Sequence, residues 1–510
     1  MATVLMSLGF AVLCVVFIVI TKHFLNSLQN LPPCPFPSLP IIGHLHLIMG
    51  KPLHRALSKI SDRHGPILLL HFGFRKVVHV SSPELAEEIY VKNDVVFANR
   101  PRLLAGKILG SNYTNLIWSP HGDHWKNLQK ISAVEILSSY RIQTLSSVRS
   151  EEARLLIRRL MKESKSNDQT VDVGSAFFEF TMNATMKMIS GKRFYGEEVE
   201  DSEEARTFRE VVKETIEVGL ASKLGDFLPL VGWIDGSEKK LVELKRKRDK
   251  LMQSLIDQNR ETEINDKLMT YDTKLKRTMI QVLLSLQGGD PIYYSDEFIM
   301  DILLALLAGG ADTSAATTQW ALALLLNNPQ VLKKAQAEMD NHVGMNRLIS
   351  ESDLAQLPYL HSIILETLRL YPVGPLAMPR ASSADCIVGG YRIPRGTMLF
   401  VNIWAIHHDP NIWAEPNRFM PERFEGLGGT RDGFKFMPFG SGRRGCPGGS
   451  LAMRMAGLTL GSIIQCFEWE RTGEEMVDMT EGPGLLLPRA HPLIAKCKPR
   501  PTIANLLSHV

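Results

Sequence analysis

One long apolar stretch, residues 295–327, constrains the fold more than any other segment of the chain. It reads SDEFIMDILLALLAGGADTSAATTQWALALLLN, opens with residues that cap a helix, and is followed by the helix-ending pair Asn328-Pro329. As a helix of about 30 residues it would be roughly 45 Å long, enough to cross a whole domain. Asp301, Asp312 and Gln319 interrupt its apolar surface. We therefore predict a helix buried in the core of a domain and not a membrane span.

The centre of this stretch, GGADTS at 309–314, is unfavourable for a buried helix. Each glycine costs about 1 kcal/mol relative to alanine, and Asp312 and Thr313 add polar groups that are costly to bury without a partner. Glycines permit close approach to the backbone, and a local widening would let a hydroxyl turn away from the carbonyl four residues earlier. By itself the segment fits a functional site and a simple helix-crossing point about equally well.

The rest of the chain predicts a mainly α fold with small β-sheets. Residues 66–80 have the pattern of a hairpin that turns at 72–74 (FGF), and residues 82–84 (SPE) open a helix in favourable order. Residues 385–402 predict a second small sheet with glycine turns. The basic stretch 238–250 fits a solvated amphipathic helix better than a lipid-binding or nuclear-localisation patch.

Composition excludes several classes of protein. The 510 residues are 45% hydrophobic and 22% charged, which excludes a disordered chain and a polytopic membrane protein. A net charge of +4 is mild for this length and argues against nucleic acid as a partner. The 6 cysteines contain no C-x-x-C pair, which favours a reducing compartment over a disulfide scaffold.

The N-terminal region predicts a membrane anchor. Residues 1–21 contain no charged side chain and, as a helix, match the hydrocarbon core of a bilayer. The stretch has neither the basic start nor the small-residue cleavage site of a secretory signal. Residues 22–40 form a juxtamembrane segment and a proline-rich hinge, which we expect to be stiff and extended. Residues 41–510 are then the main domain.

The stretch PFGSGRRGCPGG, residues 438–449, holds a single cysteine between an arginine pair and a Pro-Gly-Gly turn. Cys446 lacks the branched apolar neighbours of a packing cysteine and the nearby second cysteine of a zinc ligand. The residues around Cys446 therefore indicate a role for its thiol other than packing or zinc binding.

Three charged residues predict a buried network. Glu366 and Arg369 lie three apart in LPYLHSIILETLRLYP and so share a helical face. The routine interpretation of such a pair is an exposed salt bridge. Arg423, in FMPERF at 419–424, supplies a third charge that would close a buried network.

Taken together, these segments resemble those of the cytochrome P-450 family. The motifs GGADTS at 309–314, E-x-x-R at 366–369, F-x-P-E-R-F at 419–424 and F-x-x-G-x-R-x-C-x-G at 439–448 occur in the order and rough spacing of that family. The resemblance covers essentially the whole chain, and the anchor and hinge are typical of the plant microsomal type. It implies the cytochrome P-450 fold, mainly α with small β-sheets, preceded by a single N-terminal transmembrane helix.

The resemblance also implies a haem b cofactor (iron protoporphyrin IX) with Cys446 as the axial thiolate ligand of the iron, a ligation that favours O–O cleavage. Phe439 would shield the sulfur, and Gly440 and Gly448 would belong to the loop beneath the porphyrin. The helix that begins after Pro447 would direct its first amides at the sulfur and lower the pKa of the thiol.

Arg444, Arg380 and Trp125 match the residues that contact the haem propionates in the family. One position departs from the family pattern W-x-x-x-R, because Gln129 stands where the arginine is expected. An amide can still donate a hydrogen bond. The lysines that could compensate for the lost charge are Lys126 and Lys130.

On the distal side, the resemblance implies that Asp312 and Thr313 help to deliver protons during oxygen activation. The glycine-rich segment 309–311 would form the groove for O₂. The roles of Glu366, Arg369 and Arg423 would be structural, because they would lock the loop beneath the haem.

The family further implies a monooxygenase that uses O₂ and electrons from NADPH. The donor would be NADPH–cytochrome P-450 reductase, with cytochrome b5 as a further candidate, and we expect no nucleic acid partner. The expected docking face contains Lys435, Arg443, Lys126 and Lys130. The expected location is the endoplasmic reticulum membrane, with one span and a cytosolic catalytic domain.

Stretches such as GDHWKNLQK and DMTEGPGLLLP resemble the plant branch of isoflavone hydroxylases and of enzymes that form methylenedioxy bridges in lignans. The substrate would be an aromatic or phenolic specialised metabolite. Some bridge-forming members replace the distal threonine, so the intact Thr313 favours hydroxylation. The candidate pocket residues are Ala308, Val373, Leu376 and Leu485, with 100–120 as a further lining segment.

Three alternatives remain open at this stage. The first is oxidative bridge or ring formation on such a substrate, and the second is hydroxylation of a terpenoid or an alkaloid. The third is a haem-thiolate isomerase or dehydratase, or a non-catalytic haem-binding protein. An isomerase or dehydratase would typically lack the acid–threonine pair and have a disturbed cysteine loop, and a non-catalytic protein would not need the pair.

Overall fold

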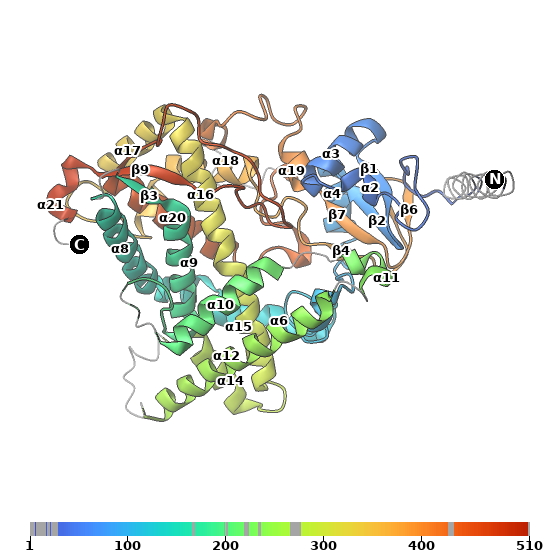
Figure 1. The fold of residues 1–510 in the computed structure, drawn as a ribbon, viewed down its shortest axis with the longest axis horizontal. Coiled ribbons are helices and arrows are strands. Elements are labelled where there is room, and N and C mark those ends of the chain that lie inside the picture. Colours follow the sequence, from blue (N-terminus) through green and yellow to red (C-terminus); the bar gives the residue numbers. More distant parts are fainter. Residues whose placement is uncertain are drawn as a thin grey trace.

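The computed structural model describes residues 29–507 apart from 166–168, 198, 200–201, 219–223, 233–235, 266–276 and 427–432, together with single positions 6, 17 and 21. The predicted anchor, residues 1–21, and residues 22–28 therefore lie outside the described residues, those three positions aside. The described chain is mainly helical and carries three small sheets, which confirms the prediction of a mainly α fold with small β-sheets (Figure 1).

The α-helices range from 4 to 29 residues in length. The α-helices are α2 Leu45–Ile48, α3 Leu53–His64, α4 Pro83–Glu87, α5 Leu104–Ile108, α6 Asp123–Ile131, α7 Ser139–Thr144, α8 Ser146–Glu163, α9 Val173–Ser190, α10 Glu203–Val218, α11 Pro229–Gly232, α12 Ser237–Asn265, α14 Met279–Gly289, α15 Asp296–Gly310, α16 Asp312–Asn327, α17 Pro329–His342, α18 Pro358–Leu370, α19 Ile403–His407, α20 Gly449–Cys466 and α21 Ala504–Leu507. Shorter π or 3-10 turns are η1 Glu88–Lys92, η2 Ser132–Ile136, η3 Leu224–Asp226, η4 Asp353–Gln356, η5 Pro421–Phe424, η6 Gly442–Arg444 and η7 Pro501–Ile503.

The strands form three separate sheets. Their bounds are β1 Ile67–Phe72, β2 Arg75–Val80, β3 Thr170–Asp172, β4 Arg380–Ala381, β5 Cys386–Val388, β6 Tyr391–Ile393, β7 Met398–Val401, β8 Phe467–Glu470 and β9 Ile494–Pro499. The largest sheet has the order β1-β2-β7-β4, in which only the β2–β7 pair is parallel. A three-stranded sheet has the order β3-β9-β8, and β5 pairs with β6 alone.

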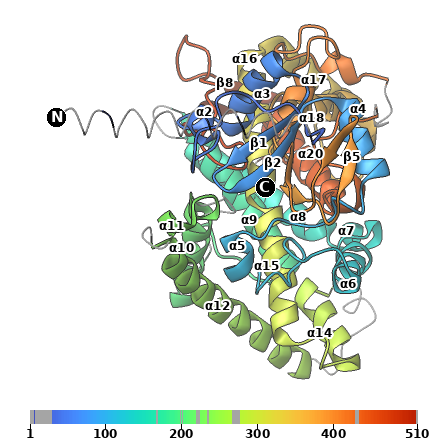
Figure 2. The ribbon, with the colours of Figure 1, turned by 90° about the vertical axis from the view of Figure 1, so that its right-hand side faces the viewer.

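The long apolar stretch forms two helices, α15 and α16, that run through the middle of the molecule (Figures 1 and 2). The predicted fault is real, because the helix is interrupted at Ala311, whose φ and ψ are −87° and −65°. Within the described residues this is the one stretch long and apolar enough to span a membrane. Its second half is buried among other helices, as predicted for a core element.

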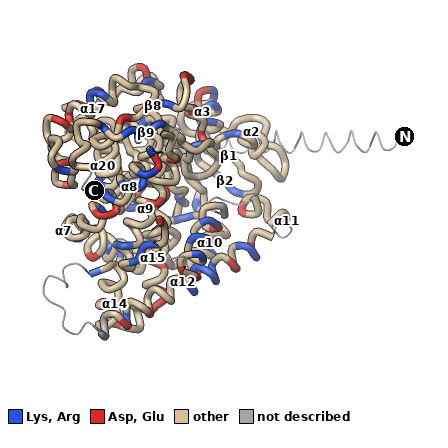
Figure 3. Tube along the Cα trace, turned by 60° about the vertical axis from the view of Figure 1, so that its left-hand side comes forward, with Lys and Arg blue, Asp and Glu red and all other residues tan. Residues whose placement is uncertain are grey.

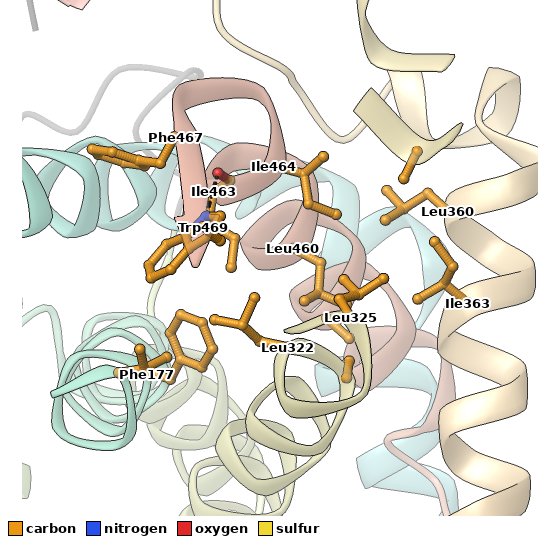
Figure 4. Packing of buried hydrophobic residues seen from close by; sticks show 14 of the residues in the cluster. Phe177, Leu322, Leu325, Leu360, Ile363, Leu460, Ile463, Ile464, Phe467 and Trp469 are labelled. Atoms are coloured by element: carbon orange, nitrogen blue, oxygen red, sulfur yellow. Dashed lines mark hydrogen bonds between the residues drawn. The ribbon is translucent and has the colours of Figure 1, made fainter. Parts of the chain in front are cut away.

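The main hydrophobic core lies where α16 meets α9, α18 and α20 (Figure 4). Leu322 and Leu325 of α16 lie between Phe177 of α9 and the aliphatic side chains of α18 and α20 in this view. Burying each such side chain contributes about 1.5–3 kcal/mol, so this cluster fixes the position of the helices that carry the site.

The predicted hairpin and the helix after it are confirmed. Strands β1 and β2 pair in antiparallel register up to Phe72 and Arg75. At Gly73 φ is +56°, and a Cβ there would lie 2.0 Å from the carbonyl oxygen of Phe227, so the turn admits only glycine. Ser82 caps α4 by accepting a hydrogen bond from the amide of Leu85.

Two sequence predictions need refinement. Residues 385–402 do not form one sheet, because β5 and β6 pair with each other whereas β7 joins the large sheet beside β2. The proline-rich hinge is extended but does not stand clear of the domain, since Leu31 is buried and the amide of Leu69 donates to the carbonyl of Pro33 at 2.9 Å.

Charged residues of both signs are interspersed along the described chain (Figure 3). The basic stretch 238–250 lies on α12, an outer helix whose Leu241 and Leu244 are buried. This is the predicted amphipathic helix, although Val242 is exposed.

Candidate functional site

The cysteine loop is a tight turn at the start of α20. Gly440 and Gly442 both have φ of +67°, a conformation that favours glycine. The amide of Cys446 donates to the carbonyl of Phe439 at 2.9 Å, which closes the loop. The Phe439 ring lies against Gly449, the first residue of α20, and Gly448 is the N-cap. The loop thus presents the sulfur at a helix N-terminus, as expected.

Cys446 is exposed although the loop lies within the fold. Burial of the surrounding region raises the pKa of its thiol, and a hydrogen bond from the backbone of Gly448 opposes that shift. The expected lowering of the pKa by the helix amides is therefore present but is outweighed by desolvation in the free thiol. A bound cation would reverse this balance, because a coordinated thiol is deprotonated.

Three buried or half-buried arginines gather beside the loop. Arg444 stacks on the ring of Trp125 at 4.1 Å, and Arg380 donates to the carbonyl of Ser441 at 2.6 Å. Arg100 donates to the carbonyls of Met378 and Pro379 at 2.8 and 2.9 Å. Burial together with the neighbouring Arg380 lowers the pKa of Arg444 to about 9. Burial, with the charges of Arg444 and Arg380, lowers the pKa of Arg100 well below its ordinary value.

The negative charge around these arginines is small. Asp94 is 5% exposed and lies 3.3 Å from Arg380, but it also pairs with Arg443 at 2.9 Å. Beside the cluster, the buried Trp125 Nε1 and His121 Nε2 have no hydrogen-bond partner among the described residues. Buried cations beside buried polar atoms without a partner are costly unless an anion binds among them. The two propionates of a haem above Cys446 would meet that requirement, so the residues present fit this cofactor.

The departure at Gln129 has a structural consequence. Its side-chain amide donates to the carbonyl of Arg443 at 3.2 Å, so it ties α6 to the cysteine loop and not to the arginine cluster. Lys126 is exposed and pairs with Asp123, and Lys130 is exposed. Neither lysine replaces the missing arginine, whereas Trp125 remains in contact with Arg444.

The distal residues lie at the interruption between α15 and α16. Gly309 is exposed, and a Cβ there would meet open space. Thr313 Oγ1 donates to the carbonyl of Gly309, four residues earlier, at 2.6 Å. The expectation that this hydroxyl turns away from that carbonyl is therefore wrong. Burial raises the pKa of the neighbouring Asp312 carboxyl. The segment thus offers a hydroxyl and a protonatable acid side by side.

The charged triad forms the closed network that its spacing suggested. Glu366 and Arg369 are fully buried and are joined by two hydrogen bonds of 2.7 and 2.8 Å. Arg423 Nε lies 3.3 Å from the same carboxylate, and the amide of Met420 donates to it at 3.0 Å. Arg369 also donates to the carbonyl of His407. The network joins α18, α19 and η5.

The candidate pocket residues have different surroundings. Ala308 and Leu485 are half-buried, and Val373 is 9% exposed and accepts a hydrogen bond from the amide of Leu487. Leu376 is 2% exposed and packs with the side chains of the large sheet. The assignment of these four residues to the substrate pocket remains a prediction.

The structure adds His121 and Asp94, which sequence reasoning missed, and it places Arg100, named only within the pocket segment 100–120, beside the cysteine loop. Each is a single polar residue in a loop or a turn, at 94–121, without a local motif that we recognised. One sequence signal could have indicated a buried role for Arg100: in FANRPR its charge is flanked by apolar and proline residues. Only the contact of this region with 441–444 shows its relation to the site.

A second group of ligand-type side chains, Cys34, His44 and His71, has its donor atoms within 4.8 Å of one another. His44 Nδ1 accepts from the amide of His71 at 2.8 Å, and His44 Nε2 lies 2.8 Å from the carbonyl oxygen of Pro35. Nε2 therefore carries the proton, and a metal at that atom would require an imidazolate. We assign no metal to this group.

Comparison with known proteins identifies the family of the chain. The family model described as Cytochrome P450 matches residues 32–495. Cytochrome P450 81Q32 of Catharanthus roseus is 48% identical over 482 residues, which cover 94% of each chain. The (+)-piperitol/(+)-sesamin synthase CYP81Q2 of Sesamum radiatum is 45% identical, covering 99% of this chain and 98% of that protein.

Two further matches define the breadth of the similarity. Isoflavone 3'-hydroxylase of Medicago truncatula is 44% identical, and the match covers 98% of each chain. A zebra fish cytochrome P450 solved with abiraterone has a TM-score of 0.72 at 24% identity, covering 88% of this chain and 100% of that one, and it shows the fold. The chain is therefore a member of the cytochrome P450 family, in the plant 81 group.

Proposed function

We propose that this cytochrome P450 hydroxylates an aromatic or phenolic plant specialised metabolite. Family membership gives the reaction class, a monooxygenase with haem, O₂ and electrons from NADPH delivered by a reductase. In the reaction one oxygen atom enters the substrate, the other leaves as water, and NADPH supplies two electrons. The substrate class is the proposal.

Each end of the site has a distinct task in this proposal. Cys446 would hold the haem iron, and Arg100, Arg380, Arg444 and Trp125 would bind the propionates. When bound, the haem supplies the chemistry of O–O cleavage. Protein groups on the distal side must then hold the substrate and provide protons.

The observation that carries hydroxylation is the intact acid–threonine pair at the helix interruption. The raised pKa lets Asp312 keep its proton at a higher pH than an ordinary carboxyl group. Thr313 lies next to it, with its hydroxyl oriented by the carbonyl of Gly309. Such a pair can pass a proton from the interior to the open side of the helix.

Replacing Thr313 by alanine is expected to lower the product formed per NADPH consumed at least about tenfold, because proton delivery would lose its oriented hydroxyl. Product and NADPH are measured together in reductase-supplemented microsomes. Thr317→Ala is the matched control, since Thr317 makes the same bond to a carbonyl four residues earlier, one turn further on. Equal coupling in both variants contradicts the role of Thr313.

The relatives direct the choice of substrate. An isoflavone hydroxylase and a synthase named for piperitol and sesamin match nearly the whole chain at similar identity. The full-length chain, expressed in microsomes with a plant reductase, should be incubated with isoflavones and with (+)-piperitol. Mass spectrometry separates the outcomes, because hydroxylation adds one oxygen atom whereas methylenedioxy-bridge formation removes two hydrogen atoms. A panel of flavonoids and lignans that yields no oxygenated product overturns the proposed substrate class.

Bridge formation is the second candidate function, and the similarity to CYP81Q2 favours it. It requires the same two electrons and one O₂, and it releases two waters as a methoxyphenol closes to a ring. A product without added oxygen from (+)-piperitol would select this function.

The proposed reductase face is the side where α6 meets the cysteine loop. Gln129 joins these two segments, and exposed Lys126 and Lys130 lie on α6. Arg443 is half-exposed and pairs with Asp94, so its charge is partly neutralised. Lys435 is exposed on the approach to the loop. Cations on this face would attract an acidic docking surface.

Lys435→Glu is expected to raise the apparent KM for reductase several-fold at low salt, with the haem spectrum unchanged. The reason is that a charge at the rim of an interface mainly changes the rate at which the two proteins associate. Steady-state rates at varied reductase concentration measure the effect. Lys59→Glu, a charge reversal on α3, is the control. An unchanged KM for Lys435→Glu rejects this face.

We also propose a single-pass anchor in the endoplasmic reticulum membrane. Large exposed apolar side chains lie on the hinge, near α2 and at the β1–β2 turn, where the amide of Gly73 donates to the carbonyl of Ile42. They are Phe36, Ile41, Met49 and Phe74. Such a patch favours contact with lipid beside the anchor.

A further inference from the structure

The turn that precedes Cys446 is held through its main chain at two nearby points. Arg380 Nη2 donates to the carbonyl of Ser441 at 2.6 Å. The amide of Arg443, two residues further on, donates to the two carboxylate oxygens of Asp94 at 3.2 and 3.1 Å. One acceptor and one donor of the same turn are thus bonded to side chains that are distant in the sequence.

The two side chains that hold the turn are also bonded to each other. Arg380 Nη1 lies 3.3 Å from Asp94 Oδ1, and the side chains of this pair are 4% and 7% exposed. Arg443 Nη1 donates to the same carboxylate at 2.9 Å, although the Arg443 side chain is half-exposed. Because a buried charge without its partner is costly, Asp94 and Arg380 keep each other in place beside the turn.

Gly442 shows how closely Asp94 approaches the turn. Its φ is +67°, and a Cβ at this position would lie 2.4 Å from Asp94 Oδ1 and 2.9 Å from Asp94 Cγ. A residue with a side chain would be strained by the backbone conformation and would also displace the carboxylate. The contact with Asp94 is therefore a second reason for glycine at position 442 of the cysteine motif.

The backbone that carries Asp94 and Arg380 is fixed by the largest sheet. Arg380 is the first residue of β4, which pairs with β7. The chain after Asp94 runs beside β4, since the amide of Ala381 donates to the carbonyl of Asn99 at 2.9 Å. The Arg380 guanidinium lies over the ring of the buried Tyr90 at 4.4 Å. Both side chains thus start from well-packed backbone, and the position of the turn follows from theirs.

We propose that Asp94 is a positioning residue that, together with Arg380, clamps residues 441–443 and so fixes the position of the Cys446 thiol. In this role Asp94 acts through the loop and needs no contact with the cofactor. Arg380 has a second task besides binding a propionate. The inference rests on the proposed ligation of the haem iron by Cys446, and it does not depend on which metabolite is oxidised.

The test compares Asp94→Asn with the parent protein, both as purified full-length holoenzymes reduced with dithionite and saturated with carbon monoxide. Asparagine keeps the size of the side chain but loses its charge, and it presents an NH₂ group to one of the donors. In a fixed low concentration of urea, the red-shifted Soret band should decay about tenfold faster, because a hydrogen bond to a charged group contributes about that factor. Haem content in the pyridine haemochrome assay should not change, since Arg100, Arg444 and Trp125 remain.

Hydrogen exchange tests the clamp without relying on the iron ligand. The amide of Arg443 should exchange about tenfold faster in Asp94→Asn, because its acceptor has lost the charge. Asp385→Asn is the matched control, since Asp385 also accepts from an arginine side chain, that of Arg392, and from a backbone amide, that of Arg395. Asp385 is half-exposed and lies next to β5, away from the cysteine loop, so its variant should leave both measurements unchanged.

Asp94→Glu serves if Asp94→Asn fails to bind haem. It keeps the charge that faces Arg380, but its longer side chain has no room beside Gly442 and would be displaced from the amide of Arg443. We expect faster exchange of that amide and faster decay of the band in this variant too. Unchanged decay or unchanged exchange in both variants overturns the clamp.

Release of haem at the rate at which the band decays also overturns the clamp, because its loss should move the thiol and leave the porphyrin in place. A parent protein without the red-shifted band would instead overturn the ligation by Cys446, on which the inference rests.

Discussion

Serine at position 446 is expected to remove the red-shifted Soret band of the dithionite-reduced, carbon-monoxide-saturated protein. The band depends on a thiolate bound to the haem iron, and a serine hydroxyl in the same loop does not ionise to replace it. Cys446 is exposed at the N-terminus of α20, and Arg380 and Arg444 lie beside its loop. Product formation should fall to the level of microsomes that lack the protein.

Difference spectra of solubilised microsomes, normalised to the amount of protein, measure this loss. Cys386→Ser is the matched control, because Cys386 is also a partly exposed thiol but lies on β5, away from the loop. The control should retain the band. A normal band in Cys446→Ser would mean that another group binds the iron, and the assignment of the site would fail.

Glu366→Ala is expected to destabilise the fold by about 3–5 kcal/mol, because it leaves Arg369 buried without its carboxylate. The exposed fraction of both side chains is 0%. The same change removes the acceptor for Arg423 and for the amide of Met420, so the chain beneath the loop would loosen. We expect most of the protein to be recovered without haem.

The chain contains its own control for this prediction. Glu415 and Arg418 are also three apart and form a salt bridge of 3.2 Å, but their side chains are 60% and 65% exposed. Such a surface pair contributes about 0–1 kcal/mol, so Glu415→Ala should leave both stability and haem content nearly unchanged. Urea unfolding followed by tryptophan fluorescence compares the two variants. Equal losses in both would show that burial does not determine the importance of the Glu366 network.

Local motifs predicted the parts of the site that are continuous in the chain. The glycines around Cys446, the start of α20 and the interruption between α15 and α16 depend on residues close in sequence, so their spacing is visible without a structure. The hairpin at β1–β2 and the cap at Ser82 were predictable for the same reason. The resemblance of these segments to one family then gave the fold and the cofactor.

The arginine cluster could not be predicted as a unit. Arg100, Arg380 and Arg444 come from three distant parts of the chain and meet only because a loop, β4 and the cysteine loop converge. Sequence spacing also does not show that Gln129 bonds to the carbonyl of Arg443, or that Leu376 packs under the sheet. The hydrogen bond from Ser111 to Asp301 belongs to the same class, since the two residues lie 190 positions apart in the chain.

The sequence by itself determined which residues can serve the site and which local turns present them. It does so because backbone preferences and helical spacing act over a few residues. Only the tertiary structure decided which charges are buried together, which donors lack a partner and how Asp312 and Cys446 titrate. Desolvation and long-range contacts set those properties, and they exist only after the chain has folded.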